Sequence, residues 1–243
     1  MARFDNLAAL LVGAERLLLP AACLLCEESL APRDERLLVC AVCRSRWRRL
    51  PASLCTRCGE PADAGSIHGC RLCAEWPAPM GRVRSAVWLD DGARRAAHAL
   101  KYGGWPGVAE AMAETMRHLA PLTTGVSLLP IPLARARARA RGYNQSERLA
   151  AAVGAGAGVP VAHGGVLVRV RETRTQTALT PEARAANVAG AFRAIGARGR
   201  AFVLVDDVFT TGATLVAAAE ALAAAGAVQI EAVTFARAVP PLA

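Results

Sequence analysis

The sequence predicts an α/β protein with a mostly parallel sheet and helices on both faces, preceded by a small cysteine-rich module. Two observations support this fold class. Apolar segments typical of strands alternate with helical segments after residue 82, and all eight cysteines lie before it. Such alternation is typical of a parallel sheet with both faces covered. With 243 residues, 53% of them hydrophobic and 20% charged, the chain suits one medium domain and a small appendage.

Short apolar runs mark the strands of the larger domain. They are residues 85–89, 127–131, 166–170, 201–205 and 228–235. Helical segments lie between them, at residues 92–100, 107–119, 144–153 and 214–225. We expect Gly154, Gly156 and Gly158 to stop the third helix. Thr180 followed by Pro181 is typical of one further helix start.

The apolar stretch at residues 7–23 superficially resembles a lipoprotein signal, because it ends in Leu-Leu-Pro-Ala-Ala-Cys. Glu15 and Arg16 interrupt it, and Asp5 stands where such signals are positive. The leucines fall near helical spacing, so we expect an amphipathic helix packed on the protein. No stretch approaches the ~20 apolar residues that span a bilayer. We therefore expect a cytoplasmic protein with no membrane span.

The cysteines form four Cys-x-x-Cys pairs, which is enough for two tetrahedral zinc sites. Disulfides are the alternative, but a chain without an export signal resides among reducing thiols. Sequential ribbons would place the first two pairs on one ion and the last two on the other, whereas cross-bracing would join the first pair to the third. The sequence leaves this choice open. The expected zinc ligands are Cys23, Cys26, Cys40, Cys43, Cys55, Cys58, Cys70 and Cys73.

The cysteine pattern also predicts the domain boundary. The stretch from Trp76 to Arg82 contains Trp-Pro-Ala-Pro-Met-Gly, which is typical of a linker. We expect residues 1–76 to hold the N-terminal helix and a double zinc ribbon, and residues 82–243 to hold the α/β domain. Because the two lie in separate domains, we expect the loss of one zinc ion to leave ligand binding in the second domain intact.

The net charge of +9 and the isoelectric point near 9.7 favour anionic partners: a phosphorylated small molecule, nucleic acid or an acidic membrane surface. Arginines from Arg44 to Arg49 flank Trp47, a combination suited to gripping a phosphate backbone and stacking a base of single-stranded DNA. Zinc ribbons commonly have basic surfaces, so a structural role is the alternative.

The strongest chemical signal runs from Val203 to Thr214, where an apolar strand leads directly into a polar loop and a helix. Asp206 and Asp207 are adjacent acceptors suited to the vicinal hydroxyls of a ribose and to positive charge at its anomeric carbon. The following loop supplies backbone amides and hydroxyls at a helix N-terminus, which favours an anion such as phosphate. An ordinary strand-to-helix turn is the alternative, but it does not explain the two acids. The loop residues are Thr210, Thr211, Gly212, Ala213 and Thr214.

Other cations follow the strand that ends near Ile131. Arginines stand there at alternate positions, and guanidinium groups suit a diphosphate; a solvated helix face is the alternative. Lys101, the only lysine, is a further candidate for contact with diphosphate, or else stabilises a helix C-terminus. The polar run 171–180 has no apolar period and suits a mobile lid or a plain solvated connector. The arginines are Arg135, Arg137, Arg139 and Arg141.

The acidic pair and the threonine loop resemble the signature of the type I phosphoribosyltransferases. In that family the acids bind the ribose hydroxyls of phosphoribosyl diphosphate, the loop binds its 5-phosphate, and Mg²⁺ accompanies the diphosphate. Further segments resemble the ComF family, bacterial proteins associated with competence and the use of external DNA. These segments are the cysteine pairs, His98-Ala-Leu-Lys101-Tyr-Gly-Gly104, Arg141-Gly-Tyr-Asn144-Gln145, and Arg174-Thr-Gln176 leading to Arg184 and Asn187. The resemblance adds Arg141, Asn144, Gln145, Arg174 and Gln176 to the expected ligand contacts.

The resemblance implies two candidate functions. In the first, an acceptor displaces diphosphate from phosphoribosyl diphosphate while Asp206 and Asp207 steady the ribosyl cation. In the second, a non-catalytic module senses phosphoribosyl diphosphate and binds single-stranded DNA, with the DNA-uptake machinery as a partner. No purine or pyrimidine pocket can be read from the residues, so the sequence does not define the acceptor. It does not define the oligomeric state either.

Overall fold

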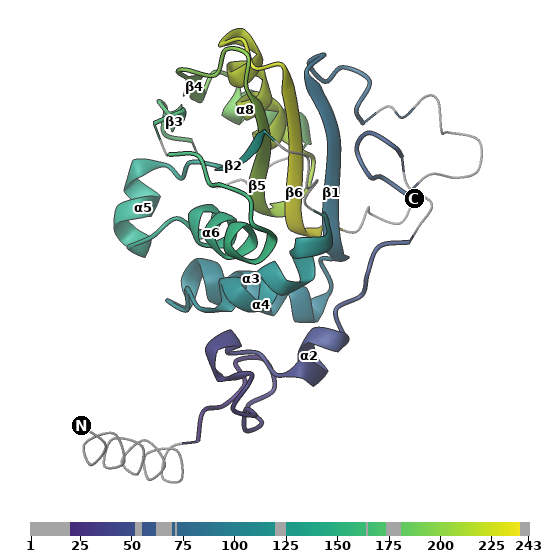
Figure 1. The fold of residues 1–243 in the computed structure, drawn as a ribbon, viewed down its shortest axis with the longest axis vertical. Coiled ribbons are helices and arrows are strands. Elements are labelled where there is room, and N and C mark those ends of the chain that lie inside the picture. The colour runs from purple at the N-terminus through teal and green to yellow at the C-terminus, as the bar shows by residue number, and fades with distance from the viewer. Residues whose placement is uncertain are drawn as a thin grey trace.

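The computed structural model describes residues 20–51, 55–61, 70, 72–119, 125–163, 165–173 and 181–238. Four parallel strands form the central sheet in the order β1, β6, β5, β2 (Figure 1). Their bounds are β1 (Met80–Trp88), β6 (Gln229–Arg237), β5 (Ala201–Phe209) and β2 (Val126–Pro130). Two short antiparallel strands, β3 (Leu167–Arg169) and β4 (Phe192–Ala194), form a separate pair. The expected α/β class with a parallel sheet is confirmed.

Helices connect the parallel strands, because a parallel pair cannot be joined by a tight turn. No helix among the residues described is long and apolar enough to cross a membrane. The helices of this domain are α3 (Asp91–Tyr102), α4 (Val108–Met116), the short 3-10 helix η2 (Arg117–Leu119), α5 (Arg135–Arg141), α6 (Gln145–Ala157), α7 (Pro181–Val188) and α8 (Ala213–Ala224).

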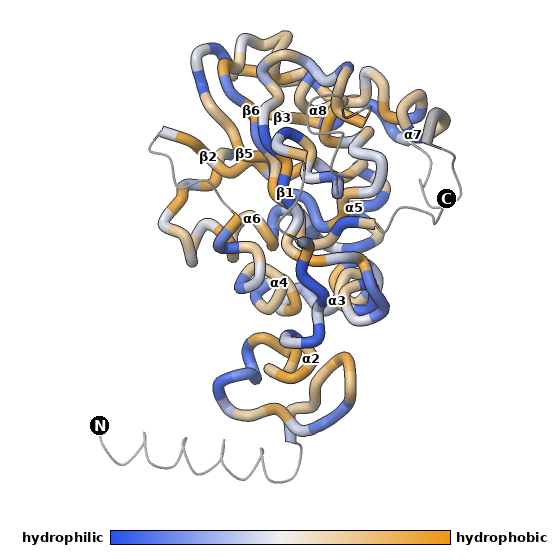
Figure 2. The backbone as a smooth tube through the Cα atoms, turned by 90° about the vertical axis from the view of Figure 1, so that its right-hand side faces the viewer, coloured by the Kyte–Doolittle hydropathy of each residue, from blue (hydrophilic) through white to orange (hydrophobic). Residues whose placement is uncertain are grey.

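Both faces of the sheet are buried, and alternate residues of β5 face opposite sides. Val203 and Val205 pack in one cluster with residues of α3, α4 and α6, whereas Phe202 and Leu204 pack in another with residues of α8. Figure 1 shows α3, α4 and α6 grouped together and apart from α8. Hydrophobic residues dominate β2 and β5 in Figure 2, as expected for strands covered on both sides.

The cysteine-rich module packs on the sheet domain at two places. Its first part contains η1 (Glu35–Leu37) and α2 (Ala41–Ser45), and its Cys23 and Cys43 share the buried cluster of α3 and α4. The second part contributes Cys55, Cys58 and Cys73 to the cluster that includes α8. The two cysteine groups therefore contact different hydrophobic clusters of the α/β domain.

Several boundaries differ from the sequence prediction. Strand β1 begins at Met80, inside the expected linker. Strand β5 continues through both acids to Phe209, because Asp206 and Val208 stay in register with β6. Strand β4 was not predicted, since its three residues are too few to show a period.

Helix α6 continues through Gly154 and Gly156, which were expected to stop it, and ends at Ala157, where Gly158 is the C-cap in the left-handed conformation, as expected. A Cβ at Gly154 would lie 2.7 Å from the carbonyl oxygen of Val159. This glycine therefore permits a close approach of the backbone rather than ending the helix. The expected N-terminal helix and the helix cap at Thr180 lie outside the described residues.

Candidate functional site

A pocket of about 990 Å³ opens where the four parallel strands end. Leu89, Ile131, Phe209 and Ala238 lie at or just beyond the ends of β1, β2, β5 and β6, and all four line it. Ligands of open α/β sheets bind at this edge, because the strand-to-helix loops meet there. The volume suits a small phosphorylated ligand.

Asp206 and Asp207 stand in this pocket with different partners. The hydroxyl of Ser146, in the first turn of α6, donates to Oδ1 of Asp206 at 2.8 Å. The backbone N–H of Asp207 donates to the same oxygen at 3.0 Å. Asp207 is 2% exposed, and its Oδ2 lies 2.5 Å from Nζ of Lys101, near the end of α3. Helices α3 and α6 therefore hold the acidic pair in place.

The surroundings of Asp206 change its ionisation. Burial and the charge of Asp207 raise the pKa of Asp206 to about 7, although Lys101 and the hydrogen bond from Ser146 act in the opposite direction. Burial lowers the pKa of Lys101, but the charge of Asp207 outweighs it and raises that pKa. A ligand that donates hydrogen bonds to Asp206, or that develops positive charge beside it, favours the carboxylate form.

The threonine loop leads from β5 into α8. Gly212 is the N-cap of α8 with φ of +79°, and a Cβ there would lie 2.9 Å from the ring of Phe209. The Oγ1 of Thr211 accepts from the backbone N–H of Ala213 at 3.5 Å. Amides in the first turn of a helix lack helical acceptors, so this loop suits an anion such as phosphate. The loop residues that line the pocket are Thr210, Gly212, Ala213 and Thr214.

Cationic side chains from α3, α5, β3 and α7 line the same pocket. An Nη of Arg137 donates to Oγ1 of Thr173 at 3.1 Å, and an Nη of Arg169 donates to the same hydroxyl at 2.5 Å. Burial lowers the pKa of Arg169 to about 10. Guanidinium groups held in this way match the oxygens of a diphosphate. The cations include Lys101, Arg137, Arg141, Arg169 and Arg184.

Asn144 and Gln145 stabilise the N-terminal end of α6. Asn144 is the N-cap of this helix: its Oδ1 accepts from the N–H of Ser146 at 3.1 Å, and its Nδ2 donates to the carbonyl of Ile131 at 3.0 Å. Asn144 thereby fixes α6 to the end of β2 and holds Ser146 beside Asp206. Arg141 donates to Oε1 of Gln145, and both residues line the pocket.

The structure places the other expected site residues differently. Arg135 is exposed and does not line the pocket, whereas Arg137, on another side of the same short helix, does. Arg174 and Gln176 lie outside the described residues.

Ser146, which bonds to Asp206, and Arg169, which lines the pocket, were not predicted as site residues from the sequence. Ser146 follows directly on the Asn144-Gln145 stretch, which was the available signal. Arg169 is the lone charge in the apolar run from Val166 to Val170, and a charge at such a position is rarely buried without a partner.

All eight cysteines are free thiols and form two groups of four. Within each group the sulfurs lie within 4.8 Å of one another. The Cys55 and Cys73 sulfurs are 3.8 Å apart, as are those of Cys26 and Cys40. Two sulfurs bound tetrahedrally to one Zn²⁺ at ~2.3 Å would be separated by about 3.8 Å. Sequential pairing is confirmed: Cys23, Cys26, Cys40 and Cys43 form one group, and Cys55, Cys58, Cys70 and Cys73 form the other.

Backbone amides point towards the sulfurs of both groups. Burial raises the pKa of Cys23, but N–H groups of Cys40, Leu25 and Cys26 outweigh it and lower that pKa to about 7. Burial likewise opposes the amides around Cys55, which lower its pKa to about 7. Four thiols that lie together, with one in each group favoured as a thiolate by backbone amides, fit a structural zinc ion.

Trp47 does not offer a surface for base stacking. Its side chain is 4% exposed, and its ring meets the ring of Phe235 edge-on with centroids 4.9 Å apart. Arg44, beside it, forms an ion pair with Asp34 at 3.0 Å. The interpretation of Trp47 as a DNA contact is therefore wrong. In a chain with 5% aromatic residues, the indole fills the interface between ribbon and sheet.

Comparison with known proteins matches both parts of the chain. Residues 14–75 match the double zinc ribbon domain, and residues 127–239 match the phosphoribosyl transferase domain. The chain is 31% identical over 224 residues to the DNA utilization protein YhgH of Escherichia coli (strain K12), covering 88% of this chain and 96% of that protein. It is 32% identical over 225 residues to the protein of the same name in Salmonella typhi, with the same coverage. The chain belongs to the ComF family.

The two domain matches divide the site features between them. Both four-cysteine groups lie in the region that matches the double zinc ribbon, and the acids and the threonine loop lie in the region that matches the phosphoribosyl transferase domain. The pocket also includes Lys101 and other residues of α3, which lies between the two matched regions. The name of these relatives refers to the use of DNA.

Proposed function

We propose that this protein binds phosphoribosyl diphosphate at the strand ends and transfers the phosphoribosyl group to an acceptor, releasing diphosphate. One observation carries the proposal: Asp206, Asp207, the threonine loop and a set of cations line a single pocket of about 990 Å³. The loop suits the 5-phosphate, the acids suit the ribose hydroxyls, and the cations suit the diphosphate.

In this reaction the bond between the anomeric carbon and a diphosphate oxygen breaks, and its electron pair leaves with the diphosphate. A lone pair of the acceptor forms the new bond to that carbon, and the acceptor then releases a proton. Asp206 and Asp207 stabilise the positive charge that develops on the ribose. Arg137 and Arg169 offset the charge of the departing diphosphate. Mg²⁺ bound to the diphosphate would add to this neutralisation.

Titration calorimetry with phosphoribosyl diphosphate and Mg²⁺ tests the binding step. The wild-type chain is expected to bind, and the double variant Asp206→Ala with Asp207→Ala is expected to lose binding. Asp91→Ala, which removes an exposed acid from the first turn of α3, is the matched control and is expected to bind as the wild type does. Equal affinity in the wild type and the double variant would remove the central claim.

A second candidate function is a sensor of phosphoribosyl diphosphate that binds single-stranded DNA. Tyr102, at the end of α3, is 63% exposed, and nearby Trp105 is 47% exposed. The guanidinium of Arg141 lies 5.2 Å from the centroid of the Tyr102 ring. Exposed aromatics beside a cation offer the base-stacking surface that Trp47 does not. The name of the relatives fits a role that involves DNA.

Release of diphosphate distinguishes the two functions. We propose to measure it with phosphoribosyl diphosphate alone, with added single-stranded oligonucleotide, and with candidate bases. Release of diphosphate that occurs only when one particular acceptor is added supports the transferase function. Binding of ligand and oligonucleotide without release in any mixture supports the sensor.

A further inference from the structure

The second cysteine group lies against the part of the sheet that carries the threonine loop. Cys55, Cys58 and Cys73 belong to the same buried cluster as Phe209, the last residue of β5, and Leu215, in the first turn of α8. The first cysteine group packs in the other cluster, with α3 and α4. Only two residues separate Phe209 from the loop glycine, Gly212, so the second group lies close to the candidate phosphate site.

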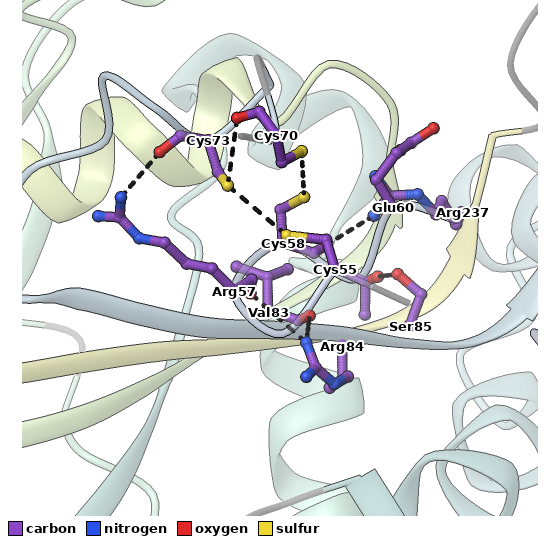
Figure 3. A network of polar contacts seen from close by, with 11 residues as sticks. Cys55, Arg57, Cys58, Glu60, Cys70, Cys73, Val83, Arg84, Ser85 and Arg237 are labelled. Carbon is purple, nitrogen blue, oxygen red and sulfur yellow. Dashed lines mark hydrogen bonds and ion pairs between the residues drawn. The ribbon is translucent and has the colours of Figure 1, made fainter. Parts of the chain in front are cut away.

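Arg237 links the second group to the sheet. It is the last residue of β6, is 2% exposed, and lies in register with Phe209. One Nη donates to the carbonyl of Cys58 at 2.9 Å, and the other contacts the carboxylate of Glu60 (Figure 3). Its guanidinium also lies 4.2 Å from the centroid of the Phe209 ring. A buried guanidinium is tolerated because the ribbon supplies both its counter-charge and a carbonyl acceptor.

The Phe209 ring in turn determines the path of the loop. A Cβ at Gly212 would lie 2.9 Å from two ring carbons of Phe209 and 3.7 Å from the ring of Trp76. The Trp76 and Phe209 rings pack with centroids 6.5 Å apart. The loop therefore runs directly over a platform of two aromatic rings.

Arg57 holds the Trp76 side of this platform. It lies between the ligands Cys55 and Cys58, and its guanidinium donates to the carbonyl of Cys73 at 2.8 Å and to that of Trp76 at 3.1 Å. It also donates to the carbonyl of Met80, where β1 begins, at 3.0 Å. Arg57 thereby ties the ribbon backbone to the tryptophan that supports the loop, as seen in part in Figure 3.

We propose that the second zinc ribbon is part of the phosphate site, and that Arg237 is the positioning residue that couples them. Without zinc the ribbon loses its order, as small zinc modules do. Arg237 then loses both of its acceptors, and the rings beneath Gly212 lose their support. Ligand affinity should therefore depend on the second zinc ion and not on the first. This inference rests on the proposed binding of phosphoribosyl diphosphate, and it replaces the sequence-based expectation that the two domains act separately.

Two single substitutions in the full-length chain test the coupling. Cys58→Ser removes a ligand from the second group, and Cys26→Ser removes an exposed ligand from the first. Elemental analysis is expected to show one zinc ion lost in each. Cys58→Ser is expected to raise the Kd for phosphoribosyl diphosphate with Mg²⁺ by about tenfold or more, and Cys26→Ser by less than about twofold.

Hydrogen exchange gives a readout that does not depend on the ligand. Mass spectrometry of the peptide covering residues 206–216 is expected to show faster deuterium uptake in Cys58→Ser than in Cys26→Ser. If the wild-type chain does not bind phosphoribosyl diphosphate, the proposed function fails, but this measurement still tests the coupling. Equal uptake in the two variants would overturn the inference.

Milder substitutions cover the case in which Cys58→Ser does not fold. Glu60→Gln and Arg237→Met leave all eight cysteines in place and are expected to retain two zinc ions, yet to speed exchange at residues 206–216. Arg237→Lys is expected to restore part of the protection, because it keeps the charge without the planar fork. Glu75→Gln, at an exposed position of the same ribbon, is the control and is expected to behave as the wild type does. Unchanged exchange in both Glu60→Gln and Arg237→Met would contradict the role assigned to Arg237.

Discussion

Lys101 and Asp207 form an ion pair in the floor of the pocket, with Nζ of the lysine 2.5 Å from Oδ2 of the aspartate. Lys101 is the only lysine of the chain and lies near the end of α3. Asp207 continues the face of β5 that carries Val203 and Val205, and that face packs with α3. The pair therefore joins the helix after β1 to the strand that bears both acids.

Removing this lysine is expected to destabilise the protein. Lys101→Met leaves the carboxylate of Asp207 buried without its counter-charge, which should lower the free energy of unfolding by about 3 kcal/mol. Denaturant unfolding at neutral pH measures the loss. The double variant Lys101→Met with Asp207→Asn is the control and should recover most of the stability. No recovery would show that Lys101 stabilises through contacts other than Asp207.

Ligand affinity is expected to rise with pH through neutrality. The pKa of Asp206 is about 7, so a growing fraction is ionised as pH increases through that value. Ribose hydroxyls donate to the carboxylate, so binding favours the anion, and affinity should rise by up to about tenfold per pH unit below 7. Calorimetry across this range measures the slope.

Asp206→Asn is the control for this pH profile. The ligand phosphates also titrate, with a pKa of about 6, and this titration is the same in the measurements on both proteins. The variant should bind weakly and lose the additional slope around 7. A slope that is identical in the variant would assign the pH dependence to the ligand alone.

Gly212→Ala is expected to weaken ligand binding, because φ of +79° strains an alanine and its Cβ would meet the Phe209 ring at 2.9 Å. Gly196→Ala is the matched control, with φ of +67° and open space around its Cβ. Both should lose about 1 kcal/mol of stability from backbone strain, measured by thermal unfolding. Only Gly212→Ala should also lose affinity for phosphoribosyl diphosphate in calorimetry. Equal affinity in the two variants would argue against a role for this loop.

Alanine substitutions at Trp47 and Trp105 are expected to affect different properties: protein stability at Trp47 and DNA binding at Trp105. Because Trp47 is 4% exposed, its replacement by alanine should lower the free energy of unfolding by about 3–5 kcal/mol. Because Trp105 is 47% exposed, its replacement by alanine should lower the free energy of unfolding by less than about 0.5 kcal/mol. Fluorescence anisotropy with a labelled single-stranded oligonucleotide is expected to show weaker binding for Trp105→Ala, by about 1–3 kcal/mol for one stacked base. Unchanged binding would move the DNA surface away from the end of α3.

Much of the fold could be predicted from the sequence, because its signals are local. The run from Ala201 to Val205 is continuously apolar, as a strand buried on both faces must be, and the polar loop with Gly212 marks the turn into α8. Cys-x-x-Cys spacing sets two thiols on one turn, so the zinc ribbons were also predicted. Strand β4 was missed, since it depends on pairing with β3, which is distant in the chain. The passage of α6 through Gly154 and Gly156 was missed as well, although Gly158 ends the helix as expected.

The sequence by itself determined the fold class, the eight thiols, and the acids and threonine loop, because each depends on residues close together in the chain. Only the tertiary structure decided which partners these residues meet. It placed Lys101 on Asp207 and Ser146 on Asp206, although 106 and 60 positions separate them. It buried Trp47 against Phe235 and set Arg237 beneath the second ribbon. Such contacts arise from strand order and helix packing, which bring distant residues together without leaving a local pattern in the sequence.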